Sequence, residues 1–361
     1  MPDALALSAM HYGPRSIALT DLPRWHGEPV TTGIYRASVD DFVVDEDLGF
    51  VPEGAGSHAW LWVEKVGVST DDAASRLAQH FQVSRKEVGY AGKKDTFARA
   101  SQWFSVPMTP GIQEGPIDPA VRIMQVSANS RKLKVGQLAG NRFQLRVTIE
   151  EGSETLVEER LAAIGQQGIA NYFGPQRFGR SGQNLDAARR LASRDPEGRR
   201  RLHPKDGMAA SAARSAGFNA LVAARIETES PLSVEVGDTV IFTGRGSQFQ
   251  VDTEALGDVR DRILTGELSP TAPMAGRVSQ TGIDQARVEQ AVLDTDSLAR
   301  WMRGVFPREE RRAVRVIPKE LVWNRMGTTL ELSFWLPRGS FATAVLHEFG
   351  SFSESHARST P

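Results

Sequence analysis

The stretch Arg142-Phe143-Gln144-Leu145-Arg146-Val147-Thr148-Ile149 alternates polar and apolar side chains along its whole length. A β-strand sends successive side chains to opposite faces, so one face of this segment carries only apolar residues and the other only polar ones. That pattern is typical of a strand whose sheet has one face in the core and one in solvent. It predicts a strand over 142–149 with its apolar residues pointing inward.

Strand patterns recur on both sides of this segment. Residues 58–65 alternate, with Trp60 and Trp62 on one face and aliphatic residues on the other. Residues 69–81 instead begin with Ser69 or Thr70 as a cap, continue with two acids and then place apolar residues at helical spacing, which predicts a helix. Three more runs have strand character. They are 102–106, 121–126 and 329–336.

The middle of the chain is mainly helical in pattern. Four segments have helical spacing, and the glycine-containing stretch 236–251 predicts a hairpin or a small barrel piece. The expected helices are 154–165, 209–224, 253–264 and 284–292. Strand character returns at 329–336, and a short helix capped by Ser340 follows up to Glu348. A β-rich start, a helical middle and a β-rich end predict an α+β protein with a second domain inserted into the first.

Length and composition narrow the class of protein. A chain of 361 residues exceeds what one core usually supports, so two domains are expected. There are no cysteines, and the seven histidines are scattered, so no metal site is expected. His347-Glu348 does not continue into a zinc motif because position 351 is Ser. No signal peptide and no membrane-length apolar run is found, so a cytoplasmic protein without membrane contact is expected.

Basic residues gather in two stretches although the net charge is only −1. Residues 85–134 hold nine basic side chains against four acidic ones, and residues 177–205 hold nine against three. The six acids between Asp40 and Glu53 stand without a base among them. Taken singly, each run is most simply a solvated face. Two such stretches around the same motifs favour a partner with a phosphate backbone.

One of those motifs is Gly89-Tyr90-Ala91-Gly92-Lys93-Lys94-Asp95, which precedes the strand-like run 102–106. Its glycines permit a tight loop that presents an aspartate at a strand edge. Taken alone, the segment is better explained as a charged turn. It is not a phosphate-binding loop, because no Gly-Lys in the chain is followed by Ser or Thr.

Seven pieces of the sequence, in order and spread over nearly the whole chain, resemble the TruD family of tRNA pseudouridine synthases, especially its bacterial members. They are Asp41-Phe42-Val43-Val44, Gly54-Ala55-Gly56-Ser57-His58, Ala91-Gly92-Lys93-Lys94-Asp95, Gln102-Trp103-Phe104-Ser105, Gly140-Asn141-Arg142-Phe143, Asn171-Tyr172-Phe173-Gly174 with Gln176-Arg177-Phe178-Gly179, and Gly339-Ser340-Phe341-Ala342-Thr343. Arg99 and Ala100 depart from the residues that are frequent in the family.

The resemblance implies a fold and domain boundaries. A pseudouridine-synthase domain with a mixed, largely antiparallel sheet is expected from residues 1–167 and 319–361. A more helical α/β domain of the TruD type is expected to be inserted at 168–318. The implied reaction is the isomerisation of uridine-13 of tRNA to pseudouridine in a cleft between the domains, with tRNA as the partner and no cofactor. A monomer is expected.

The resemblance also implies site residues. Asp95 takes the place of the catalytic aspartate, and Arg36 takes that of a basic residue that is often lysine. Three further residues match the pocket that holds the flipped uridine, and Gln102 is a substrate-side or loop-ordering amide. The three are Phe42, Asn141 and Phe341. Contacts with the RNA are predicted for Lys94, Arg177 and Arg180.

Physical chemistry adds one expectation about Asp95 and leaves two alternative functions open. A carboxylate that acts on C1′ must stay ionised in a partly dry site, so Asp95 should lie next to Arg36. A non-catalytic RNA-binding protein would have the same basic stretches but no use for the aspartate. A hydrolytic glycosidase would need a second acid and would release free uracil. A serine hydrolase is excluded, since no Gly-x-Ser-x-Gly occurs.

Overall fold

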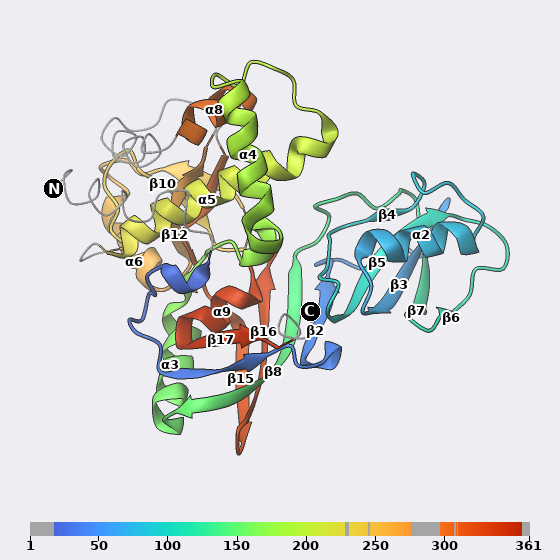
Figure 1. The fold of residues 1–361 in the computed structure, drawn as a ribbon, viewed down its shortest axis with the longest axis horizontal. Coiled ribbons are helices and arrows are strands. Elements are labelled where there is room, and N and C mark those ends of the chain that lie inside the picture. The colour runs from blue at the N-terminus through green and yellow to red at the C-terminus, as the bar shows by residue number, and fades with distance from the viewer. Residues whose placement is uncertain are drawn as a thin grey trace. The chain divides into compact units, whose positions relative to one another are not determined.

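A computed structural model describes residues 18–227, 231–244, 246–275, 297–306, 308 and 310–355 (Figure 1). The chain forms two compact units, each made of separate stretches of sequence. The sheet unit contains residues 31–154, 318–339 and 351–361, and the helical unit contains 1–30, 155–317 and 340–350. The inserted domain expected at 168–318, with its boundaries, stays a prediction.

Eleven strands of the described chain form one sheet, in the order β15-β16-β8-β2-β5-β3-β7-β6, with β1 beside β8 and β17, and β4 beside β5. They are β1 Thr31–Tyr35, β2 Phe42–Asp47, β3 His58–Val66, β4 Gly89–Tyr90, β5 Arg99–Pro107, β6 Gly115–Asp118, β7 Val121–Asn129, β8 Gly140–Gly152, β15 Lys319–Met326, β16 Thr329–Pro337 and β17 Gly350–Glu354. β2 and β5 run parallel, whereas β8 is antiparallel to β2 and β16. The expected mixed sheet is confirmed.

The alternating segment lies in β8 and supplies the core of this sheet. Phe143, Leu145, Val147 and Ile149 are all buried, as the alternation predicts. Phe143 pairs with Phe334 of β16 on one side and with Val44 of β2 on the other. The rings of Phe143 and Phe334 stack with centroids 5.5 Å apart. Strand β8 therefore joins the N-terminal and C-terminal strands through one apolar layer.

The predicted helix near residue 70 is α2, Thr70–His80. Ser69 caps it by accepting a hydrogen bond from the Asp72 amide at 3.1 Å, which satisfies one of the free N–H groups of the first turn. Its buried face, with Leu77 at the centre, packs in one cluster with Leu61 and Val63 of β3 and Phe104 of β5. The helix thus covers one face of the sheet (Figure 1).

The helical unit contains six described α-helices and a four-stranded sheet in the order β11-β10-β12-β13. The helices are α3 Glu154–Gln167, α4 Gln183–Arg194, α5 Gly207–Ile226, α6 Leu256–Leu264, α8 Ser297–Val305 and α9 Ala342–Phe349. The sheet strands are β10 Thr239–Phe242, β11 Gln248–Gln250, β12 Leu268–Met274 and β13 Glu310–Ala313, and β9 Ile169–Ala170 pairs separately with β14 Arg315–Val316. In Figure 1, α5 runs through this unit next to α4.

The expectations for this unit have different outcomes. The hairpin expected at 236–251 is β10 and β11, which pair antiparallel, and the helices expected at 154–165, 209–224 and 253–264 are α3, α5 and α6. The helix expected at 284–292 lies outside the described residues. Among the described helices, none has both the length and the apolar character needed to cross a bilayer.

Truncating Phe334 tests the role of the apolar layer. Its side chain is 0% exposed and stacks on Phe143, so Phe334→Ala should lower the free energy of unfolding by about 3–5 kcal/mol. Val322→Ala is the control, because Val322 lies on neighbouring β15 and is 61% exposed; a change within about 0.5 kcal/mol is expected there. Urea denaturation measures both. Equal losses for the two variants would contradict this account of the core.

Candidate active site

The loop 91–98 joins β4 to β5 and carries Asp95. Strand β4 pairs with the far part of β5, Gly89 opposite Ser105 and Tyr90 opposite Phe104, so the loop leaves the sheet and returns to its edge. A side chain at Gly89 would overlap the carbonyl oxygen of Leu133, which explains the glycine at this position. The glycine-containing motif therefore forms the tight loop that the sequence predicts.

Two buried polar side chains hold the loop from beneath. The Thr70 hydroxyl, at the start of α2, accepts a hydrogen bond from the Lys94 amide and donates one to Gln102 Oε1, both at 2.8 Å. Gln102 Nε2 in turn donates to the Gly92 carbonyl at 2.9 Å. Gln102 is 0% exposed, so its amide is occupied by the loop. Of the two roles predicted for Gln102, loop ordering is the one that these contacts support.

Lys94 is held inside the same loop. Its Nζ lies 2.5 Å from Glu46 Oε1, and the two side chains are 5% and 0% exposed. Burial raises the pKa of Glu46, while Lys94 and the Trp103 amide, which donates to Oε2 at 3.1 Å, oppose that rise. An RNA phosphate would have to displace Glu46 to reach Lys94. The RNA contact predicted for Lys94 therefore finds no support in this geometry.

Asp95 forms an ion pair with Arg36 Nη2, so the predicted proximity of the two residues is confirmed. Arg36 Nη1 also binds Glu354 Oε1 of β17 at 2.7 Å. The Arg36 side chain is 3% exposed, whereas Asp95 and Glu354 are 32% and 28% exposed. Both carboxylates thus keep an edge open to solvent while the cation between them is enclosed.

Arg36 is placed by its backbone and by two aromatic rings. It follows β1 with a φ of 57°, a left-handed conformation that costs a non-glycine residue roughly 1–2 kcal/mol. Its guanidinium lies 3.9 Å from the centroid of the Phe42 ring and 5.6 Å from that of Tyr35. Burial alone would lower the pKa of Arg36, but Asp95, Tyr35 and Glu354 outweigh it and the pKa is raised. The cation beside Asp95 is therefore permanent.

Lys65 is a second cation below the loop, and the motif comparison does not include it. Its Nζ donates to the carbonyl oxygens of Asp95, at 2.6 Å, and Val68, at 2.8 Å. The side chain is 0% exposed, and burial lowers its pKa to about 8. One signal was available in the sequence. Lys65 is in phase with Leu61 and Val63, on the aliphatic face of 58–65.

Asn141 lies on the same face of the sheet as Glu46, its cross-strand partner, and as Phe42 and Phe143. Its Oδ1 is buried without a hydrogen-bond partner within the part of the chain that the structure describes. A buried acceptor without a donor is costly, so such an atom is a candidate ligand-binding group. Phe42 supports Arg36, with Phe143 edge-on to it at 6.2 Å between centroids.

The remaining predicted residues belong to the helical unit. Phe341 precedes α9, and its ring lies 5.6 Å from that of Phe173. Arg177 lies in the 3-10 turn η3 Pro175–Phe178, and Arg180 begins the turn η4 Arg180–Gly182. The roles predicted for these three residues stay predictions.

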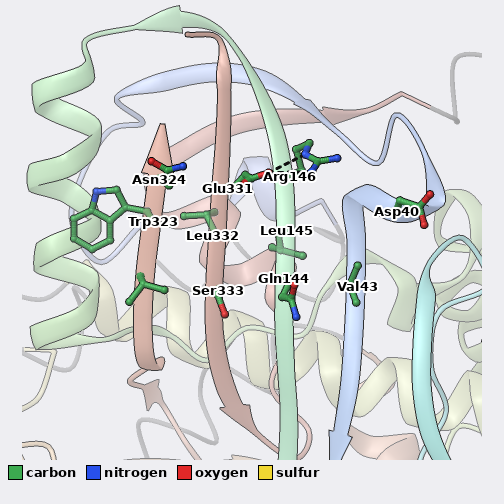
Figure 2. A pocket seen from close by; sticks show the side chains of 11 residues that line it. Asp40, Val43, Gln144, Leu145, Arg146, Trp323, Asn324, Glu331, Leu332 and Ser333 are labelled. Atoms are coloured by element: carbon green, nitrogen blue, oxygen red, sulfur yellow. Dashed lines mark hydrogen bonds and ion pairs between the residues drawn. The ribbon is translucent and has the colours of Figure 1, made fainter. Parts of the chain in front are cut away.

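A shallow hollow of about 290 Å³ lies on the other face of the sheet (Figure 2). Val43, Gln144 and Ser333 line it, alternating with the buried residues of β2, β8 and β16, and Arg146 and Glu331 close one end with an ion pair of 3.0 Å. It includes none of the predicted site residues. Among the described residues, no cluster of three His, Asp or Glu could hold a metal ion.

Comparisons with known proteins decide the family. The family model for tRNA pseudouridine synthase D (TruD) matches residues 25–199 and 202–349. The chain belongs to the tRNA pseudouridine synthase D family. It is 38% identical over 340 residues to tRNA pseudouridine synthase D of Chromohalobacter salexigens, covering 90% of this chain and 96% of the relative. The relative from Aeromonas hydrophila is 39% identical over 340 residues, covering 91% and 94%.

A solved structure supports the fold of this family member. The putative tRNA pseudouridine synthase D of Methanosarcina mazei superposes with a TM-score of 0.65 at 22% identity, covering 89% of this chain and 94% of that one. At this identity the likeness concerns the fold alone. It agrees with the mixed sheet accompanied by a helical unit that the sequence predicts.

The lowered pKa of Lys65 predicts a pH dependence of stability. The unfolded chain binds the lysine proton up to about pH 10.5 and the folded chain only up to about pH 8, so folding releases a proton between these values. The wild type should therefore gain stability relative to Lys65→Met as the pH rises through this window, by an amount on the order of 3 kcal/mol. Urea denaturation of both proteins at several pH values measures the difference.

Lys93→Met is the matched control for that series. Lys93 lies in the same loop and is exposed, and its hydrogen bond to Asp71 raises its pKa, so no gain is expected between pH 8 and 10. A difference between wild type and Lys65→Met that stays constant with pH would show that Lys65 has an ordinary pKa.

Proposed function

We propose that this protein isomerises uridine-13 of tRNA to pseudouridine, with Asp95 as the catalytic carboxylate. Membership of the tRNA pseudouridine synthase D family supports the reaction and the tRNA substrate. The observation that carries the assignment of Asp95 is its position. It is a partly exposed carboxylate on a rigid loop, ion-paired to an enclosed arginine.

The reaction places defined demands on such a group. The C1′–N1 bond of the uridine breaks, the uracil turns and C5 bonds to C1′. The C5 proton leaves to water, and N1 takes up a proton from water. The atoms balance within one nucleotide, so the reaction requires no redox partner, metal or cofactor. A carboxylate either adds to C1′ or assists elimination at the sugar, and one aspartate serves both routes. Either route requires the anionic form of Asp95.

Arg36 supplies a positive charge beside this carboxylate. Its Nη2 forms an ion pair with Asp95. Glu354 holds the other arm of the guanidinium at 2.7 Å, so the fork is fixed in direction as well as in charge. Asp95 thus receives a preorganised partner, which costs no rearrangement during the reaction.

The uridine has to leave its stack to reach the carboxylate, because a stacked base shields its own glycosidic bond. Asn141 is the proposed group that reads the extruded base. Among the residues that the structure describes, none donates to its Oδ1, and the N3–H of uracil is a donor. Phe341 is the proposed aromatic platform on the side of the helical unit, by resemblance to the family. Gln102 and Lys65 act through the loop and are proposed as positioning residues.

Replacing Asp95 tests the catalytic assignment. Asp95→Asn keeps the shape of the side chain but removes its charge, so the release of tritium from 5-labelled uridine in tRNA should fall by about 10³-fold or more. Asp258→Asn, an exposed aspartate of α6, is the control and should keep the wild-type rate. An active Asp95→Asn protein would refute the role of Asp95. Tritium release by the wild type excludes a protein that only binds RNA, and free uracil among the products would indicate a glycosidase.

The position of the modified nucleotide is tested in cells. Chemical mapping of pseudouridine across the RNA of a strain that lacks this protein should show the loss of the signal at position 13 of tRNA and retention of the other pseudouridines. A copy of the wild-type gene should restore that signal, and an Asp95→Asn copy should not. Loss at a different position would contradict the assignment of uridine-13 and leave the reaction type unaffected.

A further inference from the structure

Two arginines of the helical unit lie against one phenylalanine, and a third lies nearby against Phe306. Arg312 of β13 lies 4.4 Å from the centroid of Phe173, and Arg177 lies 5.6 Å from the same centroid. Arg214 of α5 lowers the pKa of Arg177 through its charge, which places it beside the pair. We call Arg177, Arg214 and Arg312 the arginine cluster. Its members come from a turn, a helix and a strand, so the fold itself brings like charges together.

The hydrogen bonds of the cluster go mainly to neutral groups. Arg312 Nη2 donates to the backbone oxygen of Asn171 at 3.1 Å and to its side-chain Oδ1 at 2.6 Å. Arg177 donates to the hydroxyls of Ser215, at 3.1 Å, and Ser211. Within the described residues neither arginine forms an ion pair. Glu310 is 74% exposed and lies 3.6 Å from Arg214.

Enclosed cations without counter-charges are unfavourable. Burial, and to a smaller extent the charge of Arg177, lower the pKa of Arg312 to about 9. Arg312 Nε is also buried without a partner in the described part of the chain. Contacts with an aromatic face stabilise a guanidinium but do not neutralise it. Charges in this setting are normally paired with an anion. Within the described residues Arg214 has Glu310, whereas Arg177 and Arg312 have no carboxylate partner.

A second orphan group lies at the same motif. Thr343 Oγ1 of α9 is buried without a partner among the described residues, and it lies where a side chain at Gly174 would be. Gly174 directly follows Phe173, the residue on which Arg177 and Arg312 lie. A hydroxyl and guanidinium forks are the donors that bind phosphate oxygens in proteins. The segment 177–205, with nine basic and three acidic residues, begins in this cluster.

We propose that the arginine cluster is a binding site for a phosphodiester group of the tRNA backbone. The inference rests on the proposed function only in taking tRNA as the ligand. It adds Arg312 to the RNA contact that the sequence predicts for Arg177. A backbone phosphate carries one negative charge and several acceptor oxygens, which suits guanidinium groups that approach from different elements.

The dependence of tRNA binding on salt tests the site. Each phosphate that a protein neutralises contributes roughly 0.7–0.9 to the slope of log affinity against log salt concentration. Arg312→Gln should reduce this slope by about one and weaken binding about ten-fold at ~0.1 M salt. Arg177→Gln, at a less enclosed position, should do the same and serves as a second variant in case Arg312→Gln does not fold. Circular dichroism and thermal melting report folding.

Arg262→Gln is the matched control. Arg262 belongs to the same unit but binds Glu267 through two hydrogen bonds of 2.9 and 2.7 Å, so its charge is already compensated and the slope should not change. Folded Arg312 and Arg177 variants that bind tRNA with the wild-type affinity and slope would overturn the proposal. Stabilisation of the wild type by inorganic phosphate, with unaltered tRNA binding in the variants, would indicate a free anion and overturn it as well.

The test of the phosphate site is independent of the test of the isomerisation reaction. Binding is measured with intact tRNA and needs no turnover, so an inactive wild type that still binds tRNA leaves the phosphate site testable. A wild type that releases tritium together with unchanged Arg312 and Arg177 variants would refute the phosphate site alone.

Discussion

Arg36 carries a charge that solvent scarcely reaches, and the candidate site is organised by the need to compensate it. An unpaired cation at this depth would cost several kcal/mol, so Arg36 requires Asp95 and Glu354 together. Asp95 is separated from Arg36 by 59 positions in the sequence, and Glu354 is separated from it by 318. The two ion pairs with Arg36 therefore bring the loop before β5 and the strand β17 to the end of β1. The left-handed backbone at Arg36 persists because these partners fix its guanidinium.

The loop 91–98, which carries Asp95, is also constrained by buried polar side chains. Lys65, Thr70 and Gln102 each fill a hydrogen-bonding need of the backbone between Gly92 and Asp95. A network of this kind is rigid when complete and costly when one member is removed, because the remaining groups stay buried without partners. The position of the Asp95 carboxylate is thus set by buried side chains that bind the backbone of its loop. This separation lets Asp95 remain partly exposed without becoming mobile.

The sequence predicts what depends on local pattern and misses what depends on long-range pairing. The alternation at 142–149 predicts β8 and its buried face, and the cap at Ser69 predicts α2, because strand and helix periods are local properties. Glu354 carries no such signal, since its role arises only when β17 reaches Arg36. Lys94 resembled a surface cation in its charged motif, and only the fold shows Glu46 beneath it. Motif resemblance predicted the pairing of Arg36 with Asp95, which periodicity alone could not.

Arg36 differs from Arg177 and Arg312 in the partners of its guanidinium, and this difference separates their uses. Arg36 has two carboxylate partners within the protein, so its charge is compensated and it holds Asp95 in place. Arg177 and Arg312 have amide and hydroxyl partners, so their charge remains for an anion from outside. A protein gains nothing in stability from enclosing like charges around one ring, and the arrangement is favourable only when a ligand neutralises them. A bound phosphate would therefore raise the free energy of unfolding of the protein. Part of the binding free energy would offset the repulsion between the two arginines in the free protein.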